Sequence, residues 1–421
     1  MKNIRKALLL CLTLIFILPV LVWANETPVM IRGIRPLGMG GAFTAIADDQ
    51  NAFFYNAAGL TQIPKWQVNI ANIPVIVSND TFEMYKWIKD HNDQLKNFDT
   101  QDNATRTSLI NDIQDNISKL RVHVSGSILN PNFISSPMGL TNNLKLTWGF
   151  GLFDVYDVNV RLNSSLLVPS VDTTGSIDSA TLIPVAVKME KIPFDLPGSL
   201  SLAGTFKFIN RGKIEELRKS VLEFDNFSPA PQFGGGHGLD ISSLYQYNEY
   251  LNFGLMVSDF GGTVIKYDAI NPNTTDKAHF FGMGFNVDRN DKVIAKPAVE
   301  NVIAPRVNVG VAYRPQNFYY WKNKFLPLTR HFVFALDLND ITSSTEKLTG
   351  ASFFKKVHAG GEYQTKMLSL RGGFNSGYPS FGVGLNLWLV KLDYAFYGDE
   401  LGRYAGQIVE WNHAISASIG F

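Results

Sequence analysis

Cysteine is almost missing from this chain, and neither sign of charge is in clear excess. The 421 residues include one cysteine, Cys11, and 38 lysines and arginines against 37 aspartates and glutamates. One cysteine excludes an internal disulfide framework and a thiolate metal site. The charge balance gives no indication of nucleic-acid binding, which normally requires a basic patch or domain.

Motifs for catalysis and nucleotide binding are also missing. The chain has no G-x-S-x-G elbow, no P-loop and no complete G-x-G-x-x-G fingerprint. Its seven histidines are scattered, without an HExxH pair or an HxxxH spacing. His237, in "FGGGHGLD", has glycine neighbours that are typical of a close backbone approach rather than of a site. We therefore expect no enzyme, no cofactor and no metal site.

Residues 1–24 have the three parts of a secretory signal peptide. Basic residues come first, an apolar run covers 7–22, and small or β-branched residues precede a cleavage site after Ala24. A membrane anchor is the weaker interpretation, because a bilayer span needs about 20 apolar residues. Leu10 is too bulky to precede a lipoprotein cysteine. Without the leader, 35 basic residues face 37 acidic ones and no cysteine is left.

From residue 65 onward, segments of roughly ten residues alternate between apolar and polar or small side chains, as transmembrane β-strands do. The clearest are 380–387, 390–397 and 409–421. A soluble sandwich would show the same period. The polar face, rich in Gly, Ser, Lys, Arg and Asp, and the aromatic residues near strand ends favour a membrane barrel with a wet interior. Lipid cannot satisfy an open sheet edge, so such a sheet must close.

The alternation predicts about 14 strands, an even number as outer-membrane barrels require. We expect them near 65–77, 121–130, 143–154, 180–190, 199–211, 236–247, 251–260, 305–314, 331–340, 355–364, 367–374, 380–387, 390–397 and 409–421. The segment 279–287 also alternates and would form a strand pair beyond the membrane, which leaves the count open by two. The link 315–330 is long and aromatic, unlike the other turns expected on its side.

Residues 82–120, between the first two strands, favour helices. Their apolar side chains at helical spacing include Trp87, Ile88, Leu109, Ile113 and Ile117. In one interpretation two amphipathic helices pack on each other at the barrel mouth. In the other, their apolar faces form an external groove that docks a hydrophobic ligand. The spacing favours packing, which is the usual role of an apolar helix face.

The stretch from Arg35 to Leu60 is "RPLGMGGAFTAIADDQNAFFYNAAGL". It resembles the N-terminal signature of the FadL/OMPP1/TodX superfamily and of its PorV-like relatives: a glycine-rich turn, a small-residue helix ending in ADD, then asparagine, aromatics and N-P-A-G-L. Here Ala57 replaces the proline. Later segments, among them "GHGLDISSLYQYN", "VNVGVAYRP" and "HFVFALDLND", resemble the PorV-like branch. The resemblance extends over nearly the whole mature chain.

This resemblance implies an all-β outer-membrane barrel of residues 65–421, closed inside by a hatch of residues 25–64. The expected hatch residues are Gly38, Gly40, Gly41, Asp48, Asp49, Asn51, Asn56 and Gly59. The glycines permit left-handed or close-packed backbone. The acids and amides can cap turns and pair with inward-facing bases such as Lys391 or Arg371. Adjacent acids point apart in a helix or strand, which argues against a shared metal or acid/base site.

Two functions follow from the resemblance. A FadL-like barrel takes up or exports hydrophobic small molecules, such as long-chain fatty acids, passively. A PorV-like barrel instead serves as a docking platform in secretion or surface attachment. Either protein lies in a Gram-negative outer membrane, where its partners are lipids, the barrel-assembly machinery, and a hydrophobic ligand or a secretion-system protein. A last strand carrying Ile415, Ile419 and Phe421 resembles the signal that the assembly machinery recognises.

Overall fold

A computed structural model of the chain describes residues 27, 31–97, 100–116, 120–163, 170–193, 196–214, 219–220, 230–291, 293–315, 332–342, 350–402 and 404–421. The predicted leader, Ile117 and most of the 315–330 link lie outside these residues.

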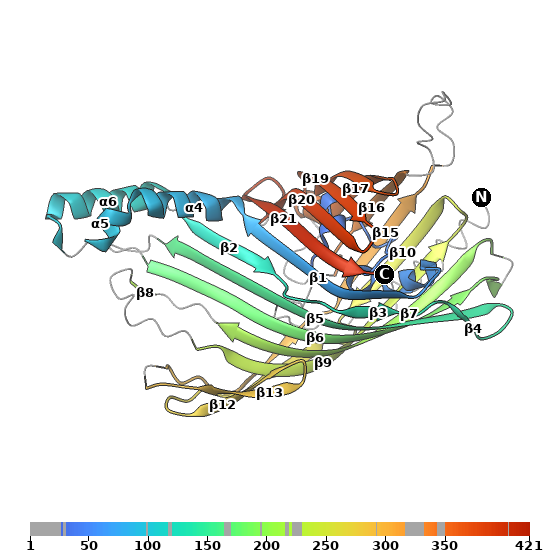
Figure 1. The fold of residues 1–421 in the computed structure, drawn as a ribbon, viewed down its shortest axis with the longest axis horizontal. Coiled ribbons are helices and arrows are strands. Elements are labelled where there is room, and N and C mark those ends of the chain that lie inside the picture. The colour runs from blue at the N-terminus through green and yellow to red at the C-terminus, as the bar shows by residue number, and fades with distance from the viewer. Residues whose placement is uncertain are drawn as a thin grey trace, which may run out of the picture.

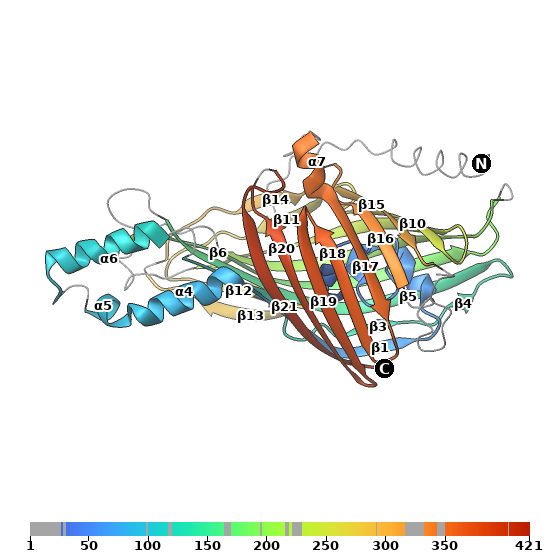
Figure 2. The same cartoon turned by 90° about the horizontal axis from the view of Figure 1, so that it is seen from above.

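Antiparallel strands form one closed barrel (Figures 1 and 2). They are β1 (Gln67–Ser78), β2 (Arg121–Gly126), β3 (Asn132–Ile134), β4 (Met138–Gly139), β5 (Leu144–Asn163), β6 (Ser170–Met189), β7 (Ser199–Ile214), β8 (Lys219–Ser220), β9 (Gln232–Gln246), β10 (Leu251–Ser258), β11 (Thr263–Tyr267), β14 (Val299–Ile303), β15 (Arg306–Tyr313), β16 (Phe332–Leu338), β17 (Val357–Gln364), β18 (Leu368–Asn375), β19 (Tyr378–Leu387), β20 (Val390–Glu400) and β21 (Val409–Gly420).

Several of these strands are pieces of one wall strand. β2, β3 and β4 all pair with β5, whereas β10 and β11 both pair with β9. β14 pairs with β11 and β15 pairs with β10, so β14 and β15 are two parts of one wall strand. β8 pairs with β6 beyond the end of β7, so β8 belongs to the same wall strand as β7. Counted as whole wall strands, they make a 14-stranded barrel, which confirms the predicted number.

The first and last strands close the wall. β21 runs antiparallel to β1, with Val77 opposite His413 and Ile73 opposite Ala417. At the end of the ladder, Phe421 and Val68 exchange two backbone hydrogen bonds of 2.8 and 2.9 Å. Every edge of the sheet is thereby paired, as the apolar surroundings of a membrane require.

Two strand boundaries differ from the sequence prediction in a consistent way. β5 continues to Asn163 and β6 begins at Ser170, so both are far longer than the predicted 143–154 and 180–190. Their outer halves pair in register, for example Asn159 with Thr174. In the outer half of β5, Val158 and Val160 do alternate with Asp157 and Asn159, so the signal is present there. In β6, residues 172–179 contain one apolar residue, Ile177, which hides the alternation.

One predicted strand, 121–130, is interrupted after Gly126. Asn130 has a positive φ of 52°, and Pro131 has no N–H to donate to the ladder. The carboxylate of Asp154 in β5 accepts the free N–H groups of Ile128 and Leu129 at 2.6 and 3.2 Å. A side chain therefore replaces the missing backbone pairing at this point of the wall.

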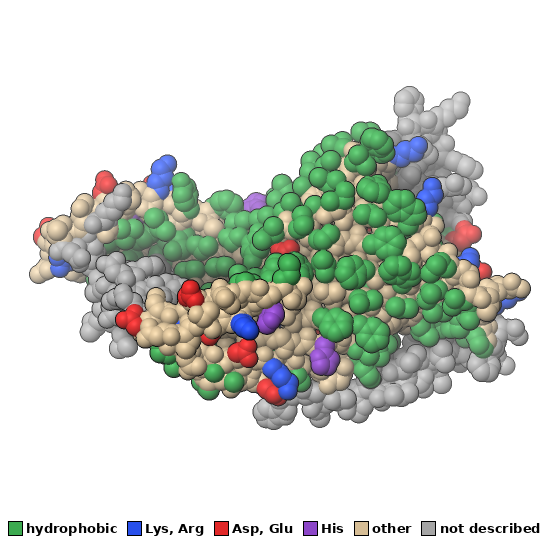
Figure 3. Space-filling model, turned by 60° about the horizontal axis from the view of Figure 1, so that its bottom comes forward, with side chains coloured by type: hydrophobic (Ala, Val, Ile, Leu, Met, Phe, Trp, Pro, Cys, Tyr) green, Lys and Arg blue, Asp and Glu red, His purple; other side chains and the backbone are tan. Residues whose placement is uncertain are grey.

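The alternation sorts side chains between the two faces of the wall. On β21, Ile415 and Ile419 are exposed on the outside, whereas Ala414 and Ser416 are buried inside. Figure 3 shows one outer face, where hydrophobic side chains cover the wall and charged ones gather mostly toward its ends. Such an apolar band between polar ends is what a bilayer selects. Tyr397 of β20, by contrast, is fully buried on the inner face.

The N-terminal segment, residues 31–63, lies inside this wall and contains α2 (Ile34–Gly38), α3 (Ala52–Tyr55) and the 3-10 helix η1 (Ala57–Gln62). Nearly all of its residues are buried. The main hydrophobic core of the molecule lies between this segment and the inward side chains of the barrel.

Helices α4 (Asn79–Asp90), α5 (Asn92–Lys96) and α6 (Asn103–Asn116) form the predicted insert between β1 and β2. They extend away from the barrel along its long axis, rather than lying across its mouth (Figure 1). The hairpin of β12 (Thr275–Phe280) and β13 (Met283–Asp288) is the predicted extra strand pair, and α7 (Gly350–Lys356) precedes β17. No helix among the described residues is both long and apolar enough to cross a bilayer.

Candidate functional site

The N-terminal segment is built from short turns that Asn56 holds together. Its Oδ1 accepts the N–H of Ala58 at 3.1 Å and so caps η1, as the sequence predicts for this residue. Its Nδ2 donates to the carbonyl oxygen of Thr44 at 2.8 Å and to that of Ser243, in β9, at 2.9 Å. The side-chain cap starts η1 at Ala57 without the proline that the family pattern has there.

The predicted glycines lie where the segment approaches other backbone closely. Gly40 and Gly41 have φ of 66° and 81°, a region that disfavours any side chain. A Cβ on Gly40 would lie 2.5 Å from carbonyl oxygens of β17 and β18, and one on Gly38 would lie 3.0 Å from a Cα of β19. A Cβ on Gly59 would lie 2.1 Å from the carbonyl oxygen of Ala47 within the segment.

Matching glycines stand on the inner face of the wall. They are Gly254, Gly310, Gly360, Gly373 and Gly382. A Cβ on Gly254 would lie 2.3 Å from the carbonyl oxygen of Thr44, and one on Gly360 would lie 2.1 Å from that of Met39. The segment and the wall therefore meet backbone to backbone at four wall strands, β10, β17, β18 and β19, whereas Gly310 makes room for the side chains of Asp337 and Thr44.

Asp48 and Asp49 converge on one cation. Nη1 of Arg35 lies 2.7 Å from Asp48 Oδ1 and 2.8 Å from Asp49 Oδ2. The expectation that these neighbours point apart is wrong, because they lie in an irregular turn and not in a helix or strand. Asp48 also lies 3.3 Å from Nη2 of Arg314. Asn51 is a further part of the turn, since its N–H and side-chain amide both donate to Asp49 at 2.8 Å.

Arg35 also ties the segment to the wall. Its Nη2 lies 2.6 Å from Oε2 of Glu362 in β17. Oε1 of Glu362 accepts from Arg371 Nε at 2.8 Å, and Nη1 of Arg371 lies 2.6 Å from Asp393. Lys391 lies 3.7 Å from the same Asp393. The expected direct pairing of Lys391 or Arg371 with acids of the segment is therefore wrong, because wall acids occupy both bases.

The arginine keeps Asp49 ionised. Burial by itself raises the pKa of Asp49, but the positive charges of Arg35 and Lys391 and the hydrogen bonds from Arg35 and Asn51 outweigh it, so this pKa lies below its ordinary 3.8. Burial likewise lowers the pKa of Arg35, whereas its three acidic partners raise it well above the usual value. Arg35 and Asp49 are therefore both charged at neutral pH.

A second wall acid holds the turn around Phe43. Oδ2 of Asp337, in β16, accepts the N–H groups of Phe43 and Thr44, both at 2.7 Å. Asp337 is fully buried, and it satisfies two donors that the turn leaves unpaired. Arg32 makes a third connection, because its Nη2 donates to Asp399 Oδ1 at 2.9 Å.

An apolar cluster joins the segment to the inner wall. Its wall members include Ile134, Phe153, Leu182, Ile209, Ile265, Tyr267 and Ile303. The rings of Phe53 and Phe54 meet Phe153 edge to face, with centroids 5.2 and 4.8 Å apart. The interior is therefore not polar throughout: an apolar strip runs along one side of it.

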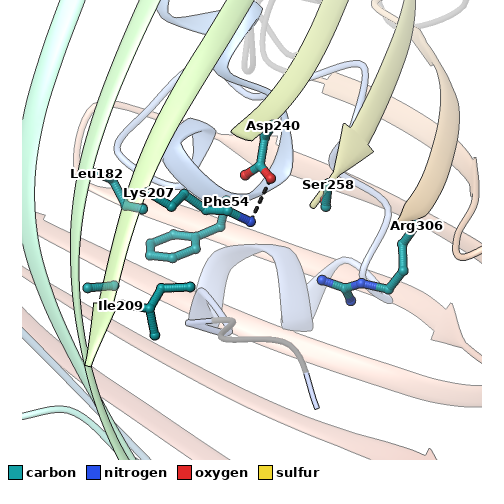
Figure 4. A pocket seen from close by; sticks show the side chains of 8 residues that line it. Phe54, Leu182, Lys207, Ile209, Asp240, Ser258 and Arg306 are labelled. Carbon is teal, nitrogen blue, oxygen red and sulfur yellow. Dashed lines mark ion pairs between the residues drawn. The ribbon is translucent and has the colours of Figure 1, made fainter. Parts of the chain in front are cut away.

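A small cavity lies beside Phe54 (Figure 4). Ala180, Leu182 and Ile209 line it on one side, and Lys207, Asp240, Ser258 and Arg306 on the other. Nζ of Lys207 is 2.6 Å from both Asp240 and Asp259, and Arg306 is 3.9 Å from Asp259. Two carboxylates thus match two cations. The cavity volume of about 20 Å³ is enough for one water molecule, so the segment closes this part of the interior.

The candidate docking residues of the insert are mostly occupied in packing. Leu109 and Ile113 of α6 are 3% and 4% exposed and contact α4, and Trp87 packs against the same cluster. Ile88 is 40% exposed, and Ile117 lies outside the described residues. This geometry fits the packing interpretation, and ligand docking here stays a prediction.

The C-terminal residues lie on the outer face of β21. Ile415, Ile419 and Phe421 are 58%, 45% and 59% exposed, and the ring of Phe421 lies 5.6 Å from that of Trp66. Their role as an assembly signal stays a prediction. No three potential metal ligands gather anywhere in the part of the chain that the structure describes.

A 14-stranded wall, an inward N-terminal segment and a helical insert after β1 together resemble known barrels. The Ralstonia pickettii toluene transporter TbuX is 13% identical with a TM-score of 0.48, over 93% of this chain and 98% of that one. The Pseudomonas putida toluene transporter TodX is 10% identical with a TM-score of 0.46, over 93% and 98%. A Pseudomonas aeruginosa FadL homologue is 9% identical with a TM-score of 0.43, over 95% and 99%.

Membership of the FadL/TodX superfamily stays a prediction from the sequence motifs. No family model matches the chain, and no curated protein matches its sequence. Identities and TM-scores this low carry neither a family nor an activity from those proteins to this chain. The PorV-like branch stays a prediction from the sequence motifs.

Sequence analysis missed three charged residues that hold the segment in place: Arg35, Glu362 and Asp337. Glu362 and Asp337 had a signal, because each is an acid on the inward face of its strand, and a buried acid needs a partner. The sequence could not identify Arg35 as the partner of Glu362, because 327 positions separate the two residues.

Proposed function

We propose that this chain is an integral outer-membrane protein whose barrel is closed from inside by residues 31–63, here called the hatch. The apolar outer face, the closed ladder and the leader expected at 1–24 support this location. The close fit between hatch and wall glycines and the buried ion pairs of Arg35 support the closing role. Its partners are membrane lipids and the barrel-assembly machinery.

The hatch assignment has a direct test. Deleting residues 33–60 is expected to leave a barrel that still migrates differently after heating, but to raise its conductance in planar bilayers. A deleted protein with the conductance of the full chain would contradict the assignment.

We further propose that hydrophobic small molecules cross this barrel passively. The apolar cluster carries this proposal: Phe53 and Phe54 of the hatch contact Phe153, and the cluster continues along the inner wall with Leu182 and Ile209. When the hatch shifts, a hydrophobic molecule can take the place of Phe53 and Phe54 against the inner wall. It then stays in contact with apolar side chains at each step of its passage. Such exchange needs no energy source.

The cavity beside Phe54 favours uncharged hydrocarbons over fatty-acid carboxylates. Lys207 and Arg306 already have Asp240 and Asp259 as partners. A ligand carboxylate would have to displace a buried acid, and leaving a buried charge unpaired is costly. An uncharged aromatic or aliphatic molecule avoids this cost.

Entry of pyrene into cells tests the transport proposal. Cells with the barrel are expected to take up pyrene faster than cells without it. Ile209→Asp puts a charge in the apolar cluster and should slow uptake at least about tenfold, since an ionised group at an apolar site costs several kcal/mol. Ile209→Val, the matched control, keeps the surface apolar. Normal uptake by a folded Ile209→Asp barrel would contradict the proposal.

A docking platform for a secretion-system protein is the second candidate. It is favoured by the helical insert, which stands away from the barrel and exposes Phe82, Tyr85 and Ile88 at 53%, 68% and 40%. Recovery of a stoichiometric protein partner from outer membranes, lost in the Phe82→Ser/Tyr85→Ser variant, would support this function. Pyrene uptake by the same variant separates it from transport.

A further inference from the structure

Four glycines face each other in pairs across β17 and β18. Gly360 is the register partner of Gly373, and Gly361 is that of Gly372. Because side chains alternate along a strand, the first pair faces the lumen and the second faces outward. At this point the wall has no side chain on either face and is one backbone layer thick.

The hatch explains the inner pair only. A Cβ on Gly360 would lie 2.1 Å from the carbonyl oxygen of Met39, and one on Gly373 would lie 2.7 Å from the nitrogen of Gly40. For outward-facing Gly372, the only atom within 4 Å of such a Cβ is a carbonyl oxygen of β19 at 4.0 Å, and its φ is not positive. A strand glycine below open space often marks the close approach of a ligand or another backbone.

Large side chains surround Gly361 and Gly372, so the two glycines form the floor of a groove on the outer face. Its outward walls are formed by Phe332, Phe334, Tyr363, Leu370 and Phe374, and its volume is about 740 Å³. The rings of Phe332 and Phe334 are stacked at 6.1 Å, and the Tyr363 ring lies 4.9 Å from that of Phe332.

The groove offers its occupant an apolar surface. The charged neighbours Glu362 and Arg371 are buried on the luminal side, where they pair with each other at 2.8 Å. Among the described residues that line the groove, none presents a charged group outward to bind a headgroup or a polar partner segment. The groove is also continuous with the apolar outer band of the barrel.

We propose that this groove holds the acyl chain of one lipid, seated on the wall directly behind the hatch. The inference rests on the proposed membrane location. Phe334 and Phe374 are 44% and 60% exposed and rise above the glycine floor. A slender chain fits between them and reaches the backbone, whereas the convex wall of a second barrel stops at these rims. The acyl chain is then separated from Met39 of the hatch only by the backbone of the wall.

Native mass spectrometry of the full chain, extracted from outer membranes with its phospholipids, tests this site. Gly372→Leu fills the groove from its floor. Gly204→Leu is the matched control, because outward-facing Gly204 of β7 also has open space, with the nearest atoms at 3.9 Å. Wild type and Gly204→Leu are expected to retain one lipid. Gly372→Leu should show about tenfold lower occupancy, equivalent to roughly two buried methylene groups.

Equal lipid retention by all three proteins would overturn the proposal. So would a lipid-free dimer of the wild type that Gly372→Leu converts to a monomer, since the occupant would then be a second copy. If Gly372→Leu does not fold, wild type and Gly372→Ala are compared with a lipid that carries a photoreactive acyl chain. The proposal expects more crosslinks at Phe334 and Phe374 than at Phe206 on β7, and equal crosslinking at all three would overturn it. If the protein takes up pyrene but retains no lipid, the lipid site is contradicted and the transport proposal is not. If the barrel is absent from the outer membrane, both the lipid site and the proposed function are overturned.

Discussion

Arg35 and Glu362 form a buried ion pair with hydrogen bonds from both Nε and Nη2, the shortest of them 2.6 Å. One residue belongs to the hatch and the other to β17, so this pair connects the two parts directly, as the pair of Arg32 with Asp399 does at β20. Glu362 also binds Arg371, which places both arginines on one carboxylate.

Replacing Glu362 should loosen the hatch. Glu362→Gln removes the charge that two buried arginines share, and breaking a buried pair typically costs about 3–5 kcal/mol. We expect a higher open probability in single-channel recordings from planar bilayers. Glu300→Gln is the control, because its partner Lys266 is 71% exposed and such pairs contribute only about 0–1 kcal/mol. Identical recordings from the two variants would contradict the role of Glu362.

Acid should open the hatch only at low pH. The pKa of Asp49 is lowered in the folded hatch, so its stabilisation is complete above the ordinary value of 3.8 and is lost as the pH falls through the lowered pKa. Conductance should stay constant from about pH 8 to 5 and rise below about pH 4. Asp49→Asn should be partly open at neutral pH. A rise between pH 7 and 5 would instead require a controlling group whose pKa is about 6 in the open hatch and lower in the closed one.

Crowding at Gly40 can be separated from backbone strain. Gly40→Ala adds both a left-handed side chain and a contact with wall carbonyl oxygens at 2.5 Å, whereas Gly406→Ala, at φ of 89° with nothing within 4 Å, adds strain alone. Strain costs roughly 1–2 kcal/mol. In urea unfolding we expect Gly406→Ala to lose about that much and Gly40→Ala clearly more, with raised conductance in Gly40→Ala only. Equal losses would indicate that the hatch is not held by shape.

Asp154 should be required at the interruption between β2 and β3. Asp154→Ala leaves the N–H groups of Ile128 and Leu129 without their acceptor, at a cost of about 1–3 kcal/mol for each donor. Asp154→Asn keeps one acceptor oxygen, which serves one of the two N–H groups, and should recover only part of the loss. The measurement is the urea midpoint of the change in heat-dependent migration. If the Asn and Ala variants have the same urea midpoint, the acceptor oxygen of residue 154 does not stabilise the barrel.

The wall was largely predictable because one face of each strand must be apolar. That rule located β19, β20 and β21 to within a few residues. It missed the outer half of β5, although Val158 and Val160 continue the alternation there, and that of β6, where residues 172–179 contain one apolar residue, Ile177. It also missed the end of β2, which depends on the φ of Asn130. Alternation locates a strand only where one of its faces carries a run of apolar residues.

The hatch was predictable in composition but not in contacts. Its glycines lie at close approaches, as expected. The convergence of Asp48 and Asp49 on Arg35 depends on an irregular turn, and the link to Glu362 depends on how the barrel curves. Neither is encoded in local periodicity.

The pairing of β21 with β1 sets an order for assembly. The hatch precedes the wall in the sequence and is made before it, yet the ring around it is complete only when Phe421 reaches Val68. A hatch that arrived after this last step would have to enter through one end of the closed barrel. A wall that curls around the hatch beforehand avoids this entry, and the contacts of Arg35 with β17 are available to guide that curling.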